Sequence, residues 1–163
     1  MTTGEFWFVS DSFYQKFQNC GLMSNKEIDS NGNPHGRPCY FTLVDKTNPD
    51  LFWFVPISSK VEKYRAIYQK CVNRYHRCDY IDFANVIGYE TAFLIQNMFP
   101  ITKQYLSDEY IQRSNNVPVR LDEISKQRII RKAYDVLAKV QKGIPLIFTD
   151  IETIKTTLLA ELQ

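Results

Sequence analysis

Segments with the pattern of β-strands are concentrated in the first hundred residues of this chain, and segments with a helical pattern in the last sixty. This segregation favours an α+β fold, in which helices pack against an antiparallel sheet. The alternating strand–helix order of a parallel nucleotide-binding sheet is absent, as are a G-x-G-x-x-G turn and a P-loop. The chain has 163 residues. Because that length can bury a core of its own, we expect residues 1–163 to form a single domain.

The strand candidates are short apolar or aromatic runs bounded by turn-forming residues. They lie at residues 6–10, 39–45, 51–56, 80–83, 91–95 and 99–102. Residues 46–50 have the composition of a hairpin turn between two of these strands. Residues 24–38 contain Asn-Gly, Asn-Pro, His-Gly and Arg-Pro, a dense cluster of turn formers. We therefore expect the longest loop of the protein there, and we expect it to be mobile.

Helical spacing of apolar residues recurs along the chain. The expected helices span residues 12–19, 59–74, 121–142 and 149–162. The third is the longest, and Gly143 and Pro145 are expected to end it. Its expected buried stripe consists of Ile130, Ala133, Leu137 and Val140. The last helix follows Thr149, which has capping-box spacing to Glu152.

The cysteine pattern favours reduced thiols over a metal site. The four cysteines contain no C-x-x-C pair, and Cys71, His76 and Cys78 lack a fourth ligand at a common zinc spacing. The N-terminus lacks the charged-then-apolar pattern of a signal peptide, and no apolar run approaches the roughly 20 residues that span a bilayer. We therefore expect a soluble, cytoplasmic protein.

The strand at residues 51–56 leads directly into a helix through Ser58, Ser59 and Lys60. Ser59 has capping-box spacing to Glu62, so the simplest interpretation makes Ser59 the N-cap of that helix. Lys60 suggests a role beyond capping, because a cation in the first turn of a helix meets the positive end of the helix dipole. Hydroxyls, a lysine and free backbone N–H groups together suit a phosphate group. These residues alone leave the helix cap and the phosphate site both open.

Basic residues are clustered locally, although the formal net charge is only +2. Six of the 20 Lys and Arg residues lie in residues 60–77 and six in residues 126–142. Four of the first group are spaced close to one line along the expected helix: Lys63, Lys70, Arg74 and Arg77. Such a line suits a polyanion, although a solvated basic face produces the same pattern.

Three blocks of the sequence resemble the toxins of type III toxin–antitoxin systems, the ToxN/AbiQ superfamily, and most closely its CptN branch. Residues 37–40 (RPCY) are similar to the family's basic residue before its second strand. Residues 52–60 (FWFVPISSK) resemble the family's strand that ends in proline, an apolar residue, hydroxyls and lysine. Residues 96–101 (QNMFPI) resemble a third family block. With the short N-terminal strand and the helical C-terminus, the resemblance covers nearly the whole chain.

The resemblance implies a compact, strongly bent, barrel-like antiparallel sheet surrounded by helices, with a helix-rich C-terminus. It implies an endoribonuclease toxin active in phage defence, which cuts cellular mRNA and processes its own repeat RNA antitoxin. The implied inhibitor is a small pseudoknot RNA that joins the toxin in a closed assembly. The expected partners are therefore RNA molecules, not DNA or a membrane.

Cleavage without a metal uses the substrate's 2′-hydroxyl as the nucleophile and leaves a 2′,3′-cyclic phosphate and a 5′-hydroxyl. The expected catalytic residues are Lys60, Ser59, Ser58, Arg37 and Tyr14. A desolvated Lys60 would act as base or charge stabiliser, either serine would bind the phosphate oxygens, and Arg37 would add a bidentate contact. Tyr14 would position the base or the leaving oxygen. His35 and His76 are better suited to substrate contact than to proton transfer.

We expect no metal and no other cofactor, because the 18 acidic residues are scattered. Asp79 and Asp82 come nearest to a paired site and are expected to cap or solvate a loop. The RNA-contact residues are expected in the two basic groups: Lys63, Lys70, Arg74, His76, Arg77, Arg128, Arg131 and Lys132. The main alternative is a non-catalytic RNA-binding module in which the Ser-Ser-Lys turn only caps a helix. A third interpretation places a small phosphorylated ligand in that turn.

Overall fold

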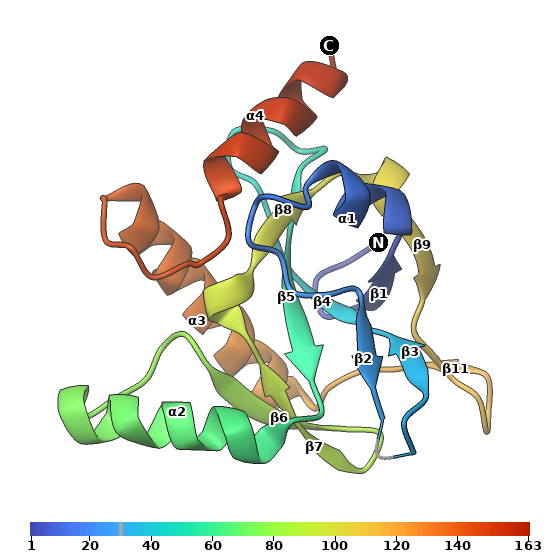
Figure 1. The fold of residues 1–163 in the computed structure, drawn as a ribbon, viewed down its shortest axis with the longest axis vertical. Helices are drawn as coiled ribbons and strands as arrows, with labels where there is room; N and C mark the ends of the chain where they lie inside the picture. The colour runs from blue at the N-terminus through green and yellow to red at the C-terminus, as the bar shows by residue number, and fades with distance from the viewer. Residues whose placement is uncertain (30) are drawn as a thin grey trace.

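The structure is a computed structural model, and it describes residues 1–29 and 31–163. Its main sheet contains β1 (Phe6–Val9), β4 (Cys39–Val44), β5 (Phe52–Ser58), β6 (Asp82–Val86), β7 (Tyr89–Phe93), β8 (Phe99–Ile101) and β9 (Leu106–Glu109). The order is β6-β7-β5-β4-β1-β9, with β8 also paired to β5, and every pairing is antiparallel (Figure 1). Two hairpins are separate: β2 (Lys26–Ile28) with β3 (Pro34–Gly36), and β10 (Ile111–Gln112) with β11 (Val117–Pro118).

Strand β5 is buried along its whole length, because both faces of the sheet are covered. Its side chains alternate between two apolar clusters, as the twofold repeat of a strand requires. Trp53 and Val55 belong to the first cluster, and Phe52 and Phe54 belong to the second. This double burial explains why the sequence of β5 is a continuous apolar run and not an alternating one.

The helices are α1 (Asp11–Lys16), α2 (Val61–Tyr75), α3 (Glu123–Gln141) and α4 (Ile151–Glu161), with 3₁₀ turns η1 (Ile95–Asn97) and η2 (Lys103–Tyr105). Helix α3 contributes Ile129 and Val136 to the first cluster, whereas α1 and α4 contribute Phe13 and Ile154 to the second. Helix α2 packs through Tyr64 and other side chains on a third cluster beside β7. In Figure 1, α1 and α4 lie at the top, α3 at the left and α2 along the bottom.

The predicted α+β class with an antiparallel sheet is confirmed. The six predicted strands and four predicted helices are present, with boundaries shifted by a few residues, and residues 46–50 form the predicted turn between β4 and β5. The barrel-like closure is not confirmed, because the described sheet is open and has β6 and β9 at its edges. No described helix is long and apolar enough to cross a membrane.

The prediction of one long loop at residues 24–38 was wrong. That segment contains the β2–β3 hairpin, in which Glu27 pairs with His35. The carboxylate of Asp29 accepts hydrogen bonds of 2.9 Å from the backbone N–H groups of Asn31 and Asn33. The turn-forming residues therefore connect two paired strands. Ser30 lies outside the described residues. Strands β9, β10 and β11 were not predicted either, because their sequences lack a clear apolar alternation.

Three details of the helices also differ from the predictions. Ser59 does not cap α2: the N-cap is Lys60, and it makes no side-chain cap bond. Helix α4 is capped by Asp150, which accepts from the Thr153 N–H, whereas the Thr149 hydroxyl donates to the Asn97 carbonyl. In α3 the predicted buried stripe is only partly correct: Ala133 and Leu137 are buried, whereas Ile130 and Val140 are partly buried. The buried residues of α3 are Ser125, Ile129, Ala133, Val136 and Leu137.

Asp45, just after β4, joins the sheet to α4 through a buried hydrogen-bond network. Its carboxylate accepts 2.9 Å bonds from Trp53 Nε1 and Lys155 Nζ. Burial by itself raises the pKa of Asp45, but hydrogen bonds from Thr47, Lys155 and Trp53 outweigh it and lower the pKa to about 2. Between about pH 2 and pH 4, Asp45 is therefore ionised in the folded protein but protonated in the unfolded chain.

We expect this network to stabilise the fold fully above about pH 4 and to be lost as the pH falls towards 2, because the unfolded state then binds the proton more tightly. Urea unfolding measured across this range should show the loss. Asp45→Asn should flatten the acid dependence, whereas Asp50→Asn, at an exposed carboxylate in the same turn, should not. An identical acid dependence in wild type and Asp45→Asn would contradict the assignment.

Candidate active-site cavity

The strand-to-helix turn at Ser58, Ser59 and Lys60 is held by its own backbone and by the sheet. Ser58 is the last residue of β5 and pairs with Ala92 of β7, which leaves it almost fully buried. The Lys60 N–H donates to Ser58 Oγ at 3.2 Å, and the Val61 N–H donates to the Ser59 carbonyl at 2.8 Å. The side chains of Ser59 and Lys60 are exposed.

Glu27, from hairpin strand β2, binds both serines. Its Oε1 accepts a hydrogen bond of 2.8 Å from Ser58 Oγ and one of 3.1 Å from Ser59 Oγ. Its Oε2 lies 3.5 Å from Arg37 Nη1, and only 5% of the surface of Glu27 is exposed. A buried carboxylate thus orients the hydroxyls of Ser58 and Ser59. Glu27 and Ser58 are 31 residues apart in the sequence.

Arg37 lies beneath the turn and holds it to the hairpin. Its Nη1 donates to the Ile57 carbonyl at 2.7 Å, its Nε donates to the Ser24 carbonyl at 2.9 Å, and its surface is 5% exposed. The guanidinium is therefore already bonded to protein acceptors on both sides. A direct bidentate phosphate contact by Arg37 stays a prediction, while its observed role is to fix Glu27 and the end of β5.

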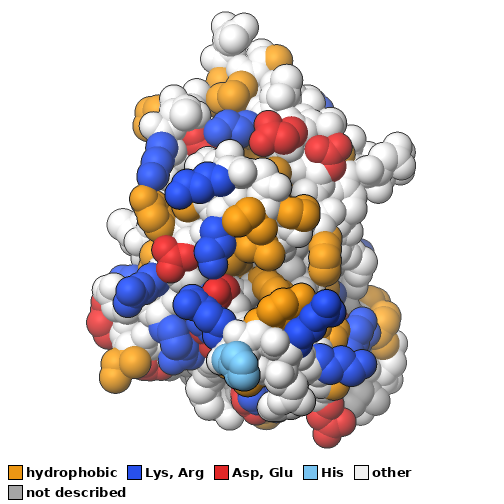
Figure 2. Space-filling model, turned by 90° about the vertical axis from the view of Figure 1, so that its left-hand side faces the viewer, with side chains coloured by type: hydrophobic (Ala, Val, Ile, Leu, Met, Phe, Trp, Pro, Cys, Tyr) orange, Lys and Arg blue, Asp and Glu red, His pale blue; other side chains and the backbone are white. Residues whose placement is uncertain are grey.

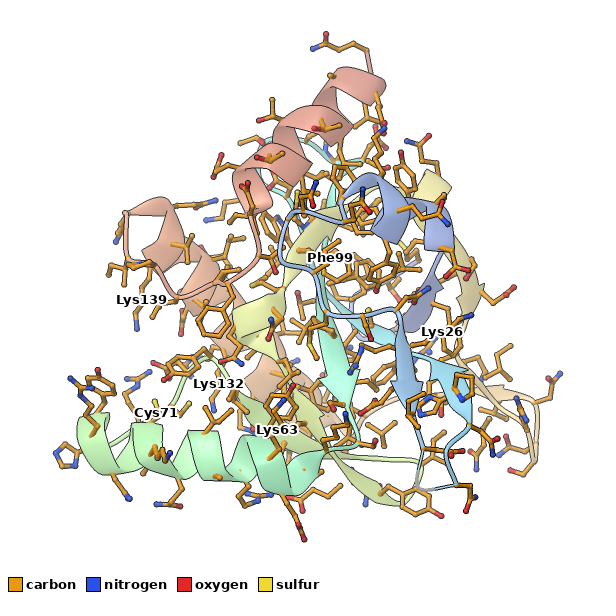
Figure 3. All side chains as sticks on the ribbon, in the orientation of Figure 1. Lys26, Lys63, Cys71, Phe99, Lys132 and Lys139 are labelled. Atoms are coloured by element: carbon orange, nitrogen blue, oxygen red, sulfur yellow. The ribbon has the colours of Figure 1, made fainter. Side chains whose placement is uncertain are left out.

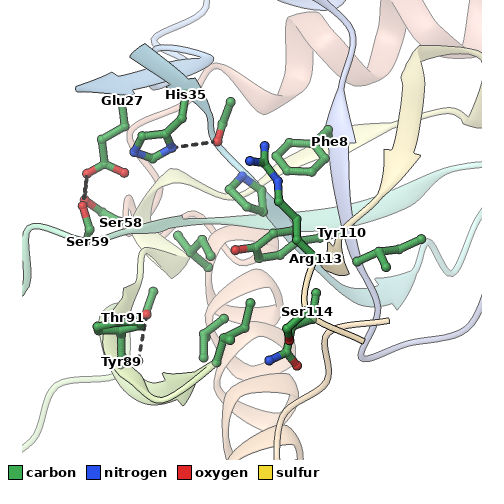
Figure 4. Close-up of a pocket in the computed structure, with 17 residues that line it drawn as sticks. Phe8, Glu27, His35, Ser58, Ser59, Tyr89, Thr91, Tyr110, Arg113 and Ser114 are labelled. Atoms are coloured by element: carbon green, nitrogen blue, oxygen red, sulfur yellow. Dashed lines mark hydrogen bonds between the residues drawn. The ribbon is translucent and has the colours of Figure 1, made fainter. Parts of the chain in front are cut away.

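A cavity of about 600 Å³ opens beside this turn (Figure 4). Glu27, His35, Ser58 and Ser59 form one side of it. The rest is lined mainly by aromatic and apolar side chains and by the β10–β11 hairpin: Phe8, Gly36, Pro38, Ile57, Val86, Ile87, Tyr89, Thr91, Tyr110, Ile111, Gln112, Arg113 and Ser114. Such a mixture of apolar walls and a few polar groups is typical of ligand sites.

Aromatic rings, an arginine and a histidine in this cavity suit a base and a phosphate. The rings of Phe8 and Tyr110 meet edge to face, with centroids 5.4 Å apart. Figure 4 shows Arg113 beside Tyr110, across the cavity from Glu27. His35 Nδ1 lies 3.1 Å from the Gly36 carbonyl oxygen. If Nδ1 carries the ring proton and donates to that oxygen, Nε2 is an acceptor.

The predicted catalytic residues are only partly brought together. Ser58 and Ser59 line the cavity, and Arg37 supports them through Glu27. Lys60 adjoins the turn, but its exposed side chain is not desolvated as the base role required. Tyr14 does not line the cavity, and its hydroxyl is 3.9 Å from Cys39 Sγ.

Tyr14 of α1 contacts Cys39, the first residue of β4; the thiol is fully buried and the tyrosine is partly buried. Burial raises the pKa of Tyr14 well above its ordinary value, with a further contribution from Cys39. Burial also raises the pKa of the Cys39 thiol to about 12. Both groups are therefore protonated and neutral near pH 7, which suits packing and hydrogen bonding better than proton transfer.

Sequence reasoning missed Glu27, Phe8, Tyr110 and Arg113. Phe8 was placed in a strand, but nothing in that strand marks the side chain that faces a cavity. Glu27 stands in a segment rich in turn formers, and no spacing links it to the serines. The sequence marks Glu27 only by the presence of a second carboxylate, Asp29, two residues later. Acidic residues at that spacing are too common to predict a site.

The predicted RNA-contact residues fall into two classes. Lys63, Lys70 and Arg74 are exposed along α2, as predicted. Arg77 is not on their line, because α2 ends at Tyr75 and His76 adopts a left-handed conformation with φ 63°. Instead, Arg77 Nη2 pairs with Asp79 at 2.7 Å.

On α3, two of the predicted contacts are tied to the protein. Arg128 Nε and Lys132 Nζ lie 2.9 Å and 3.2 Å from Asp82 Oδ2, whereas Arg131 is exposed. Lys132 lies between α2 and α3, as Figure 3 shows, and also donates to the Cys78 carbonyl. Lys and Arg side chains nevertheless gather on the face that carries the end of α2 and α3 (Figure 2).

Asp79 and Asp82 are ion-pair partners of these cations and do not merely cap a loop. Within residues 1–29 and 31–163, no group of three or more His, Cys, Asp or Glu side chains is arranged to hold a metal ion. All four cysteines are buried and free.

No protein-family model matches the sequence, and no match to a curated protein sequence is found. The fold does match a solved structure, that of AbiQ, a lactococcal anti-phage endoribonuclease belonging to the type-III toxin-antitoxin system. The TM-score is 0.67 at 18% sequence identity, over 98% of this chain and 99% of that one. This likeness shows a shared fold over nearly the whole chain. The CptN branch suggested by the sequence stays a prediction.

Removing the Glu27 carboxylate should destabilise the protein, because it leaves the buried Arg37 charge without its carboxylate counter-ion. We expect Glu27→Ala to lower the free energy of unfolding by about 3–5 kcal/mol in urea titrations. Glu62→Ala removes an exposed carboxylate at the start of α2 and should cost no more than about 0.5 kcal/mol. Equal stability of the two variants would contradict the role given to the Glu27–Arg37 pair.

Proposed function

We propose that this chain is an endoribonuclease toxin of a type III toxin–antitoxin system, and that residues 1–163 act as one catalytic domain. The observation that carries the proposal is the turn at Ser58, Ser59 and Lys60, where two oriented hydroxyls, a cation and a helix N-terminus adjoin a cavity of about 600 Å³. The shared fold with an endoribonuclease of such a system supports it. The resemblance of residues 52–60 to the family's own turn supports it independently.

The proposed reaction needs no metal. The substrate's 2′-hydroxyl attacks the adjacent phosphorus, the bond to the 5′-oxygen breaks, and the products carry a 2′,3′-cyclic phosphate and a 5′-hydroxyl. The first N–H groups of a helix have no partner within it and carry a partial positive charge. The Val61 N–H is taken by the Ser59 carbonyl, so the next N–H groups of α2, together with Lys60, bind the non-bridging oxygens and stabilise the charge of the phosphorane.

The two serines have different roles in this proposal. Ser58 is buried, donates to Glu27 and accepts from the Lys60 N–H, so its hydroxyl is fully used in shaping the turn. Ser59 is exposed at the cavity and can turn its hydroxyl from Glu27 to a phosphate oxygen. Ser59 is therefore the substrate-binding serine, and Ser58, Glu27 and Arg37 are positioning residues.

Proton transfer is assigned to His35, which lines the cavity on the same side as Glu27 and the two serines. Imidazole is the side chain that most readily exchanges a proton near neutral pH. Phe8 and Tyr110 offer rings against which a base can pack, and Arg113 offers a phosphate contact. Lys60 acts as a charge stabiliser, since its side chain is exposed.

The partners follow from the same proposal. The inhibitor is a small pseudoknot RNA, cut from a repeat transcript by the toxin and held with it in a closed assembly in the cytoplasm. Cellular mRNA is the substrate of the free toxin. The relation to the CptN branch belongs to the proposal as well, on the strength of the three sequence blocks.

The activity is tested by incubating the protein with RNA in excess EDTA and analysing the fragment ends. Wild type should produce cyclic-phosphate ends, and Lys60→Ala, Ser59→Ala and His35→Gln should each reduce the rate by roughly 10²–10⁴-fold. Lys103→Ala, at an exposed lysine of η2, is the matched control and should cut normally. Tight binding without cutting would instead indicate a non-catalytic RNA-binding module, and no affinity for RNA would refute both.

The basic line on α2 is tested separately by the salt dependence of RNA binding. Replacing Lys63, Lys70 and Arg74 by Gln should lower the slope of log affinity against log salt by about 0.7 for each of these cations that neutralises a phosphate of single-stranded RNA. Arg65→Gln is the control on the same helix, because Arg65 pairs with Glu90 and covers the Phe83 ring. An unchanged slope in the triple variant would show that this face is only solvated.

A further inference from the structure

Tyr110 is held in the cavity beside the Ser58-Ser59-Lys60 turn by its own backbone and by two aromatic rings. Its N–H donates to the Phe6 carbonyl at 2.8 Å, and its carbonyl accepts from the Val119 N–H at 2.9 Å. The rings of Phe6 and Phe8 meet its ring edge to face, with centroids 6.4 Å and 5.4 Å away. The side chain is therefore positioned before any ligand binds.

Phe8, which packs against Tyr110, is itself confined by strand β3. A β-carbon at Gly36 would lie only 3.1 Å from Phe8 Cδ1. Because Gly36 has no side chain, the Phe8 ring packs directly on the backbone of β3. Phe8 thus forms a wall that holds the Tyr110 ring in its place.

The hydroxyl of Tyr110 is available to a ligand. Figure 4 shows it pointing into the cavity, and it makes no hydrogen bond with another residue in 1–29 or 31–163. Burial raises the pKa of Tyr110, and the positive charge of the nearby Arg113 only partly offsets that rise. The hydroxyl is therefore protonated near pH 7 and can donate a hydrogen bond to an anion.

Arg113 is the only residue with a permanent positive charge among the described residues that line this cavity. It lies in the exposed turn of the β10–β11 hairpin, where the Asn116 N–H donates to the Gln112 carbonyl at 2.9 Å. Within the described part of the chain, Arg113 pairs with no carboxylate. Glu27, the one carboxylate of the described lining, is bound by Arg37 and by the two serines. The charge of Arg113 is thus available to an anion.

The cavity therefore carries groups that bind anions on two sides. Ser59 and the start of α2 form one side, and Tyr110 and Arg113 lie across from them (Figure 4). Arginine and hydroxyl side chains are the donors that proteins commonly direct at nucleic-acid phosphates. A volume of about 600 Å³ leaves room for a ligand of the size of a nucleotide between the two sides.

We propose that Tyr110 and Arg113 bind a second phosphate of the substrate RNA, next to the phosphate that is cleaved at Ser59. The Tyr110 hydroxyl and the Arg113 guanidinium donate to its non-bridging oxygens. The nucleotide that joins the two phosphates then occupies the cavity against Phe8. Fixing the strand at both phosphates orients the bond that is cut. The inference rests on the proposed function, because it takes RNA as the ligand and the Ser58-Ser59-Lys60 turn as the cleavage site.

The test compares three 2′-fluoro dinucleotides of mixed base composition, which lack the 2′-hydroxyl nucleophile and are not cut. They carry no terminal phosphate, a 3′-phosphate or a 5′-phosphate, and their affinities are measured by competition with a fluorescent oligonucleotide. One of the terminal phosphates should raise the affinity of wild type by roughly 10- to 100-fold. Its position shows on which side of the cleaved bond the second phosphate lies.

Tyr110→Phe and Arg113→Gln should each remove most of this gain and leave the affinity for the dinucleotide without a terminal phosphate unchanged. Tyr110→Phe retains the packed ring, so its melting temperature should equal that of wild type. The matched controls are Tyr75→Phe and Lys142→Gln, at exposed residues that do not line this cavity. Both should keep the full gain.

Lys60→Ala distinguishes the two phosphate positions. It should weaken all three dinucleotides by a similar factor, because Lys60 binds the phosphate that all three share. Loss of the gain in Lys60→Ala, with the gain kept in Arg113→Gln, would place the terminal phosphate at the Ser58-Ser59-Lys60 turn and overturn the proposal.

The proposal is also overturned if neither terminal phosphate raises the affinity of wild type, or if Tyr110→Phe and Arg113→Gln both keep the gain. An equal loss for all three dinucleotides in Tyr110→Phe, with a lower melting temperature, would assign Tyr110 a structural role and equally overturn it. Cleavage of RNA without any gain would refute the second phosphate site but not the nuclease. A gain that depends on Tyr110 and Arg113, without cleavage of RNA, would refute the nuclease but not the phosphate site.

Discussion

The burial of both faces of β5 determines where the other elements of this fold lie. Its side chains alternate between two apolar clusters, so one face must be covered by α3 and the other by α1 and α4. It also pairs with β4, with β8 at its start and with β7 at its end. A strand held in this way cannot shift its register without moving every side chain to the wrong face. Its last residue, Ser58, is therefore presented at a fixed point, and α2 begins from there.

The ion pair of Glu27 and Arg37 connects this rigid strand end to the β2–β3 hairpin. Burying two charges costs free energy that their attraction only partly recovers, so the pair is poor evidence of stability. What it does supply is position: Arg37 bonds the Ile57 carbonyl, and Glu27 bonds the hydroxyls of Ser58 and Ser59. These contacts join the hairpin, the strand and the start of the helix, and the hairpin also brings His35 to the same cavity. Preorganised donors of this kind are what stabilise charge in a transition state.

Helix α2 begins beside one cavity, at the Ser58-Ser59-Lys60 turn, and its C-terminal half lines another. Its N-terminus carries the positive end of the dipole beside Lys60 and Ser59, which suits a phosphate. Its C-terminal half contributes Ile67, Cys71 and Tyr75 to a second cavity of about 690 Å³. The cations of α3 contribute less to this surface than their number implies, because Arg128 and Lys132 are held by Asp82. Along α2, the exposed cations outside the ion pairs of the described residues are Lys63, Lys70 and Arg74.

The sequence by itself determined the α+β class, the principal strands and helices, and the Ser58-Ser59-Lys60 turn, because periodicity and turn chemistry act between residues close in the chain. It placed four of the five predicted catalytic residues at or beneath that turn, but not Tyr14, which packs on Cys39. Only the tertiary structure decided the hairpin at residues 26–36, the Glu27 contacts and the pairing of Asp82 with α3. These contacts join residues tens of positions apart through single side chains, and such contacts leave no period in a sequence. Which hydroxyl is exposed and which is buried therefore depended on the fold.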